Sequence, residues 1–165
     1  MIGRAARIGA VTAVAAVALG VIAAVGQPAT GASRGAGGAV AAARDATRPF
    51  QNLQHAMNSG YGFFTDAKGI ACIDMKGMGG MGVHFVNSTL VGNATERVRT
   101  PEAVVYRIDP HGKLVLAALE YVVLKSAWDA THSARPRLFG HTFNFTPAGN
   151  RYGLPPFYSL HAWVW

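Results

Sequence analysis

A β-hairpin is encoded in the stretch VVYRIDPHGKLVLAALEY, and it commits the chain to an antiparallel sheet. Pro110 stands where a type I turn needs a fixed φ, and Gly112 stands where the bulge that follows needs a positive φ. Apolar, β-prone residues flank the turn on both sides. We therefore predict two adjacent antiparallel strands over 102–108 and 114–124.

The turn also predicts how these two strands pair. It pairs Asp109 with Lys113, and the rest of the register follows by counting outward. The resulting pairs are Ile108 with Leu114, Tyr106 with Leu116, Val104 with Ala118, and Glu102 with Glu120. Opposed glutamates repel unless a proton or a cation lies between them, so we expect a raised pKa on one of them. Such pairs often mark functional sites. A two- or four-residue loop would instead pair Glu102 with Leu119.

The remaining chain indicates a small α+β domain. Apolar residues recur at helical spacing over 47–59, and Gly60 provides a stop signal for that helix. Further strands are expected over 83–86 and 158–165, with a short one near 141–145. We predict one N-terminal helix packed on a mostly antiparallel β-sheet.

The N-terminus is typical of a secretory signal, predicted over 1–32. Arg4 and Arg7 precede an apolar run over 8–25, and small residues follow. An uncleaved membrane anchor is the alternative reading of that run. A flexible Gly/Ala-rich segment is expected over 33–46, followed by a single domain over 47–165. The chain stops within a predicted strand, so we expect the domain to be truncated at its C-terminus.

The charge and the cysteine content of the chain limit the classes of partner that it could bind. The formal charge of +7 becomes +5 when the two arginines of the signal are subtracted. The remaining basic residues form no stripe, which argues against nucleic-acid binding, while contact with anionic cell-envelope material fits a cationic exported protein. Other partners, including further copies of the chain, stay open. Cys72 is the single cysteine, so it is expected to be buried, ligated or paired with another chain.

A G-x-G-x-x-G pattern begins at Gly77 and ends at Gly82. In a dinucleotide-binding loop this pattern follows a strand and opens a helix, whose amide groups hold the pyrophosphate. Here β-prone residues follow it, so we expect no nucleotide cofactor. We interpret the glycines as a tight bend at the entrance of the strand that carries His84.

Four residues on predicted strands form a candidate metal site. They are His84, Glu102, Glu120 and His161. Two imidazoles and two carboxylates could hold zinc, manganese, iron or copper. The alternative is that each histidine is a half-buried, hydrogen-bonded residue and that the glutamates pair with nearby arginine or lysine. Neither reading identifies a catalytic residue, so a role other than catalysis is favoured.

Four blocks of the sequence resemble those of a group of small exported bacterial proteins, mostly actinobacterial. Here they read GGMGVHF, PEAVVY, LEY and LHAWVW, against G-M-G-x-H-[YF], P-E-x-L-x-Y, V-E-Y and L-H-x-W-x-W in the group. The resemblance extends over 50–165. It implies export, a common domain and a further tail after the tryptophans, and it supplies no biochemical activity. All four candidate metal ligands lie inside these blocks.

The sequence therefore supports three hypotheses about the function of the protein. The leading hypothesis is an exported protein that binds a metal ion or a small polar ligand in a His/Glu pocket. The second is a secreted interaction or apolar-ligand-binding module that uses Tyr158 and Trp163. The third is a small hydrolase that uses the paired glutamates as acid and base.

Overall fold

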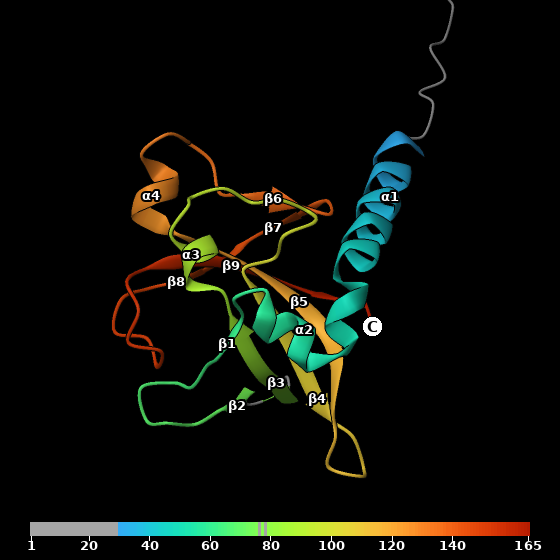
Figure 1. The fold of residues 1–165 in the computed structure, drawn as a ribbon. Coiled ribbons are helices and arrows are strands. Elements are labelled where there is room, and N and C mark those ends of the chain that lie inside the picture. Colours follow the sequence, from blue (N-terminus) through green and yellow to red (C-terminus); the bar gives the residue numbers. More distant parts are fainter. Residues whose placement is uncertain (1–29, 76, 78) are drawn as a thin grey trace, which may run out of the picture.

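The computed structural model describes residues 30–75, 77 and 79–165, and it confirms the α+β class (Figure 1). Residues 1–29, which hold most of the predicted signal, lie outside the described residues. Among the residues that are described, none of the helices is both long and apolar enough to cross a membrane.

A mostly antiparallel sheet organises the domain. Its strands run in the order β1-β3-β4-β5-β9-β8, and β2 pairs with the first residues of β3. Their bounds are β1 (Gly62–Phe63), β2 (Cys72–Met75), β3 (Gly79–Val86), β4 (Ala103–Ile108), β5 (Leu114–Leu124), β8 (Asn144–Thr146) and β9 (Phe157–Trp163). A separate two-stranded sheet pairs β6 (Arg137–Leu138) with β7 (His141–Thr142), and two short helices, α3 (Ser88–Val91) and α4 (Lys125–Asp129), join the strands.

The N-terminal helical region differs from the prediction. The single helix expected over 47–59 is a 3-10 turn, η1 (Arg48–Gln51), followed by α2 (Leu53–Asn58). Asn52 separates them because its backbone is extended, and its side chain caps α2 by accepting from the amide of Gln54. The segment expected to be flexible is also helical, in α1 (Thr30–Thr47), which is rich in alanine, the strongest helix former.

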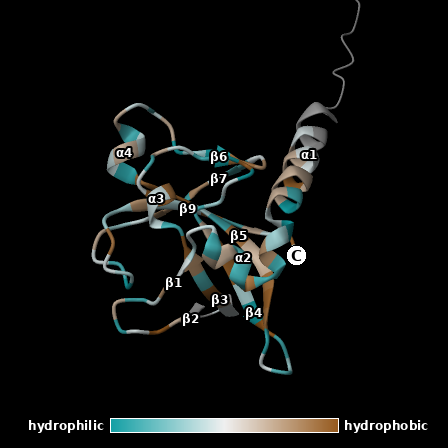
Figure 2. Cartoon of the chain, in the orientation of Figure 1, coloured by the Kyte–Doolittle hydropathy of each residue, from teal (hydrophilic) through white to brown (hydrophobic). Residues whose placement is uncertain are grey.

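One face of the sheet packs against these helices and forms the core. Phe85, Val104, Tyr106, Leu119 and Tyr121 are buried there. The tyrosine hydroxyls find backbone acceptors: Tyr106 donates to the Phe50 carbonyl at 2.6 Å, and Tyr121 to that of Val98 at 2.8 Å. Hydrophilic residues gather instead in loops such as the tip of the β4–β5 hairpin (Figure 2).

The hairpin turn forms as predicted, but the register beyond it does not. The amide of Asp109 donates to Lys113, Gly112 has a φ of 79°, and the first two apolar pairs are confirmed. A bulge at Ala117 then shifts the pairing, so that Val104 faces Leu119, and Glu120 faces Ala103. The predicted opposition of Glu102 and Glu120 is therefore wrong. The inserted residue places these side chains on opposite faces of the sheet.

The glycine-rich stretch leads into a strand, as the sequence indicated, although that strand begins earlier than expected. β3 starts at Gly79, and its first residues pair with β2. Gly82 has a φ of +85°, and a Cβ atom there would lie 2.8 Å from the carbonyl oxygen of Tyr106. Glycine at this position lets β3 pack closely on β4. Cys72, at the start of β2, is exposed rather than buried.

Candidate functional site

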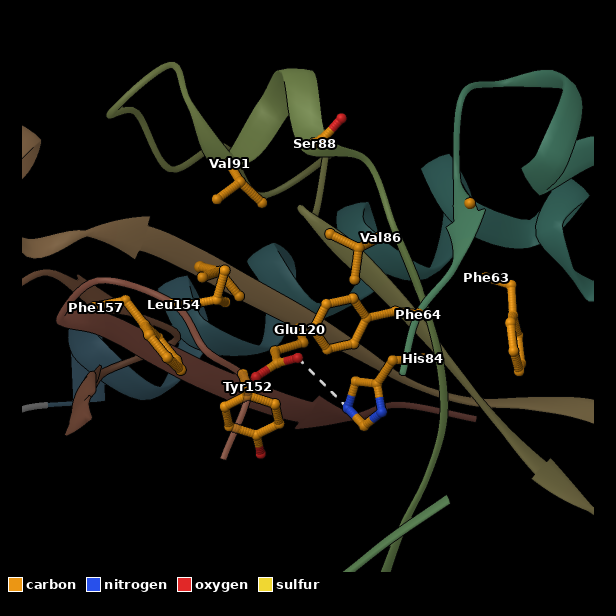
Figure 3. A pocket seen from close by; sticks show the side chains of 12 residues that line it. Phe63, Phe64, His84, Val86, Ser88, Val91, Glu120, Tyr152, Leu154 and Phe157 are labelled. Atoms are coloured by element: carbon orange, nitrogen blue, oxygen red, sulfur yellow. Dashed lines mark ion pairs between the residues drawn. The ribbon is translucent and has the colours of Figure 1, made fainter. Parts of the chain in front are cut away.

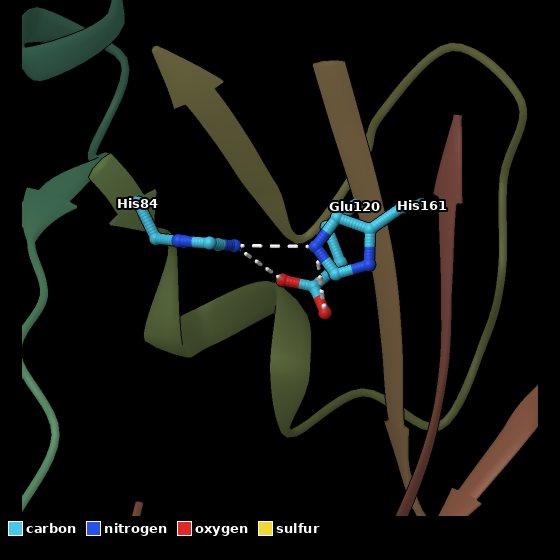
Figure 4. A group of neighbouring side chains, drawn as sticks. All are labelled: His84, Glu120 and His161. Carbon is cyan, nitrogen blue, oxygen red and sulfur yellow. Dashed lines mark hydrogen bonds and ion pairs between the residues drawn. The ribbon is translucent and has the colours of Figure 1, made fainter. Parts of the chain in front are cut away.

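Three of the four predicted ligands meet on the face of the sheet opposite the core. His84 comes from β3, Glu120 from β5 and His161 from β9 (Figure 4). Glu120 lies directly opposite His161 and, on its other side, opposite Ala103 of β4. His84 lies opposite Val105 of β4, and its ring reaches across that strand to the side chains of Glu120 and His161.

The three side chains converge at short, nearly equal distances. The Nε2 atoms of His84 and His161 are 3.2 Å apart. Each also lies 3.5 Å from one carboxylate oxygen of Glu120. A zinc ion with Zn–N bonds of about 2.1 Å at tetrahedral angles separates its ligand atoms by about 3.4 Å. The spacing of this His84–Glu120–His161 cluster therefore matches the spacing that one first-row metal ion requires.

Burial sets the protonation of the two histidines. It lowers the pKa of His161 to about 4. It also lowers the pKa of His84, and the neighbouring His161 acts in the same direction, while Glu120 and the Gly82 backbone oppose them. Both imidazoles are therefore neutral near pH 7, which is the form that donates a lone pair to a metal.

Glu120 has the opposite shift. Burial raises the pKa of its carboxyl group, and the partial offsets come from His84 and from the Ser159 hydroxyl. A carboxylate held away from water needs a proton or a cation to compensate its charge. The Glu120 carboxyl group, whose charged form needs a compensating proton or cation, thus lies beside the Nε2 atoms of both histidines.

Metal binding through Nε2 of His84 would require one particular tautomer of its ring. Its Nδ1 atom is buried and forms no well-aligned hydrogen bond within the part of the chain described here, although the Gly82 backbone lies close enough to favour the charged ring. If Nε2 donates to a metal, Nδ1 must carry the proton of the neutral ring. With Nε2 of His84 unprotonated, a hydrogen bond between the two imidazoles needs the hydrogen on Nε2 of His161.

Glu102, the fourth predicted ligand, does not join the cluster. Its side chain is 1 % exposed, and one carboxylate oxygen accepts from the amide of Val122 at 3.0 Å. Burial raises the pKa of Glu102 to about 8, only partly offset by hydrogen bonds from the amides of Val122 and Glu102 itself. The residue is a buried acid near the core tyrosines rather than a part of the site.

An apolar pocket of about 340 Å³ opens onto the cluster (Figure 3). Its polar residues include His84 and Glu120, while most of its wall is aromatic or aliphatic. The lining comprises Gly62, Phe63, Phe64, His84, Val86, Ser88, Val91, Glu120, Val122, Tyr152, Leu154 and Phe157. A pocket that is mainly apolar with a few convergent polar groups has the composition of a small-molecule site.

Part of the pocket wall was missing from the prediction because it comes from irregular segments. Phe64 follows β1, and Tyr152 and Leu154 precede β9. The two segments are joined by Asp66, whose carboxylate accepts from Arg151 at 2.7 Å and 3.1 Å. No local pattern marks these residues as pocket residues. The pairing of Asp66 with Arg151 depends on contacts between positions far apart in the chain.

The comparisons with known proteins return nothing for this chain: no family model, no curated protein and no solved structure matches it.

Proposed function

We propose that this protein is an exported metal-binding protein. His84, Glu120 and His161 hold one divalent first-row transition-metal ion at the base of the apolar pocket. The observation that carries the proposal is the convergence of two neutral imidazole nitrogens and one carboxylate at 3.2 to 3.5 Å from one another. Export is supported by the basic, apolar and small-residue order of the N-terminal sequence.

The chemistry of the donor set supports a transition metal over a calcium or magnesium ion. Calcium and magnesium prefer oxygen ligands, whereas imidazole suits zinc, copper, iron and nickel. Two histidines and one glutamate also leave coordination positions free, as in catalytic zinc sites and in non-haem iron sites. The ion would therefore be able to accept a further ligand from the pocket side.

The hydrolase hypothesis finds less support. It needed Glu102 and Glu120 side by side as an acid and base pair, and the bulge at Ala117 places them on opposite faces of the sheet. The metal hypothesis needs only Glu120, which lies between the two histidines.

Metal binding can be measured directly on protein purified without a polyhistidine tag. We expect the wild-type chain to bind one Zn²⁺ or Co²⁺ ion, measured by metal analysis after dialysis and by calorimetry. Glu120→Gln and His161→Gln should each weaken the affinity by at least about tenfold, because each removes one of three ligands. Affinity should also rise with pH across the range where Glu120 loses its proton, since the metal competes with that proton.

The matched control is His111→Gln, which changes an exposed histidine in the β4–β5 turn. It should leave the metal affinity unchanged. Circular dichroism of each variant establishes that the fold is retained. Equal affinity in the wild type and in both folded ligand variants would contradict the proposal, as would wild-type protein that retains no metal.

A further inference from the structure

We infer that the pocket binds a small monoanion with an apolar body, and that its anionic oxygen head completes the coordination of the metal. The inference rests on the proposed function, because the metal supplies the charge that the head would meet. Two features of the site lead to it: the composition of the pocket wall and the net charge at the pocket base.

The wall determines the body of the ligand. Phe64, Tyr152, Leu154 and Phe157 surround the space in front of His84 and Glu120 (Figure 3). Such surfaces favour alkyl or aryl groups, because apolar area is removed from water on both partners. The volume of about 340 Å³ lies at the small end of the range for ligand sites, so the body must be short.

The charge at the base determines the head. Two neutral histidines, one carboxylate and a divalent cation sum to a net charge of +1. An uncompensated charge in a half-buried, mostly apolar site is costly, and a monoanion compensates it. The pocket lining includes His84 and Glu120, so a ligand in the pocket can reach the coordination positions that three protein ligands leave free.

The arrangement of the site also determines the charge of the ligand's head group. Without a metal, the pocket presents the Glu120 carboxyl group and the His84 ring at this point, and it offers no cation for a carboxylate ligand to bind. With a metal, the same carboxylate binds a cation directly. Affinity for a monoanion should therefore depend on the metal, which separates this arrangement from a purely apolar pocket.

The test uses octanoate as the probe, with octanamide as its neutral counterpart and hexanoate as its shorter one. By calorimetry, octanoate should bind the Zn²⁺-loaded protein at least about tenfold more tightly than the metal-free protein, and at least about tenfold more tightly than octanamide binds. Removing two buried methylenes should make hexanoate about tenfold weaker. Octanoate should also change the visible spectrum of the Co²⁺-loaded protein, because it enters the coordination shell.

Substitutions at Leu154 locate the probe. Leu154→Asp places a charged, hydrated group in the apolar wall and should weaken octanoate binding to the Zn²⁺-loaded protein by at least about tenfold, while the chain still binds one Zn²⁺ ion. Leu154→Met, the matched control, keeps an apolar side chain of similar volume and should retain both affinities.

The outcomes separate the two proposals. Protein that binds one Zn²⁺ ion but binds octanoate no better than octanamide, or equally well without the metal, overturns this inference and leaves the metal site standing. Unchanged octanoate affinity in folded Leu154→Asp also overturns it, because the probe then binds elsewhere. Protein that binds no metal overturns the proposed function and this inference together.

Discussion

Glu102 directly precedes β4 and Glu120 lies on the neighbouring strand β5, yet the environments of the two side chains differ. Glu120 faces two neutral histidines on the pocket face, whereas Glu102 lies by the core tyrosines and accepts from the amide of Val122. β5 extends beyond the first residue of β4, and the Glu102 carboxyl group meets a strand amide at that point. The role of Glu102 is therefore structural: it satisfies a buried backbone donor.

The pKa of Glu102 makes a prediction about stability. Its folded value of about 8 lies above the ordinary value of 4.5. Between these values the folded state binds more protons than the unfolded state, so its stability should fall as pH rises from about 5 to about 8. The total loss is on the order of 4 kcal/mol. Glu102→Gln keeps an acceptor for Val122 without the charge, so it should flatten this dependence and stabilise the protein at pH 8.

Denaturant unfolding of both proteins at pH 5, 6.5 and 8 measures the effect. Asp45→Asn, which changes an exposed carboxylate on α1, should leave the slope with pH as in the wild type. A slope in Glu102→Gln equal to that of the wild type would show that Glu102 does not titrate in this range.

At the level of secondary-structure elements, one inserted residue decides which side chains reach the site. In a regular strand, Leu116 and Glu120 would share a face. The bulge at Ala117 places Leu116 in the core and Glu120 on the opposite face. β5 can therefore supply Leu116 to the core and, further on, Glu120 to the cluster on the opposite face.

The close approach of β3 and β4 makes a second prediction. Gly82→Ala introduces a Cβ atom at 2.8 Å from the Tyr106 carbonyl oxygen, in a backbone conformation with φ of +85°. Strain and overlap together should destabilise the protein by about 2 to 4 kcal/mol. Because β3 carries His84, metal affinity should fall as well.

Gly80→Ala is the matched control, since it lies in the same strand and a Cβ atom there meets nothing within 4 Å. Thermal unfolding should show a small change for Gly80→Ala and a large one for Gly82→Ala. Similar melting temperatures for the two variants would mean that β3 can move away from β4 at little cost.

Across the whole molecule, the pocket depends on contacts between distant segments. The wall residues Phe64 and Tyr152 belong to two loops that Asp66 and Arg151 hold together. The Asp66 carboxylate also accepts from the amides of Lys68 and Ile70, and the Ile70 amide and Arg151 keep its pKa below the ordinary range. This link is therefore present at neutral pH and is lost only as pH falls through that lowered pKa.

Asp66→Asn should loosen the pocket without altering the His84–Glu120–His161 cluster. The amide side chain can still accept from the loop backbone, but it loses the charge that pairs with Arg151. We expect faster hydrogen exchange over 64–70 and 147–156, with metal affinity unchanged. Asp45→Asn removes the exposed pair with Arg48 and is the control. Exchange rates equal to the wild type in both loops would contradict this role for Asp66.

The conformational preferences of individual residues were sufficient to predict much of the antiparallel framework. Pro110 and Gly112 specify their turn through their own φ preferences, and the alternating apolar residues beside them specify two strands. His84 and His161 could be named as candidates because each stands on a predicted strand, whereas Glu120 was named through a pairing with Glu102 that the bulge removes. These features depend on a few neighbouring residues, so they can be predicted from the sequence alone.

The residues alone predicted the antiparallel framework, and the four candidate ligands named from them include the three side chains that converge in the cluster. Tertiary structure decided the bulge at Ala117, the separation of Glu102 from Glu120, and the pocket wall around Phe64 and Tyr152. The physical reason is that a strand accepts an extra residue at little local cost. The position of the bulge is therefore set by which side chains can be buried in the core and which can find polar partners on the opposite face.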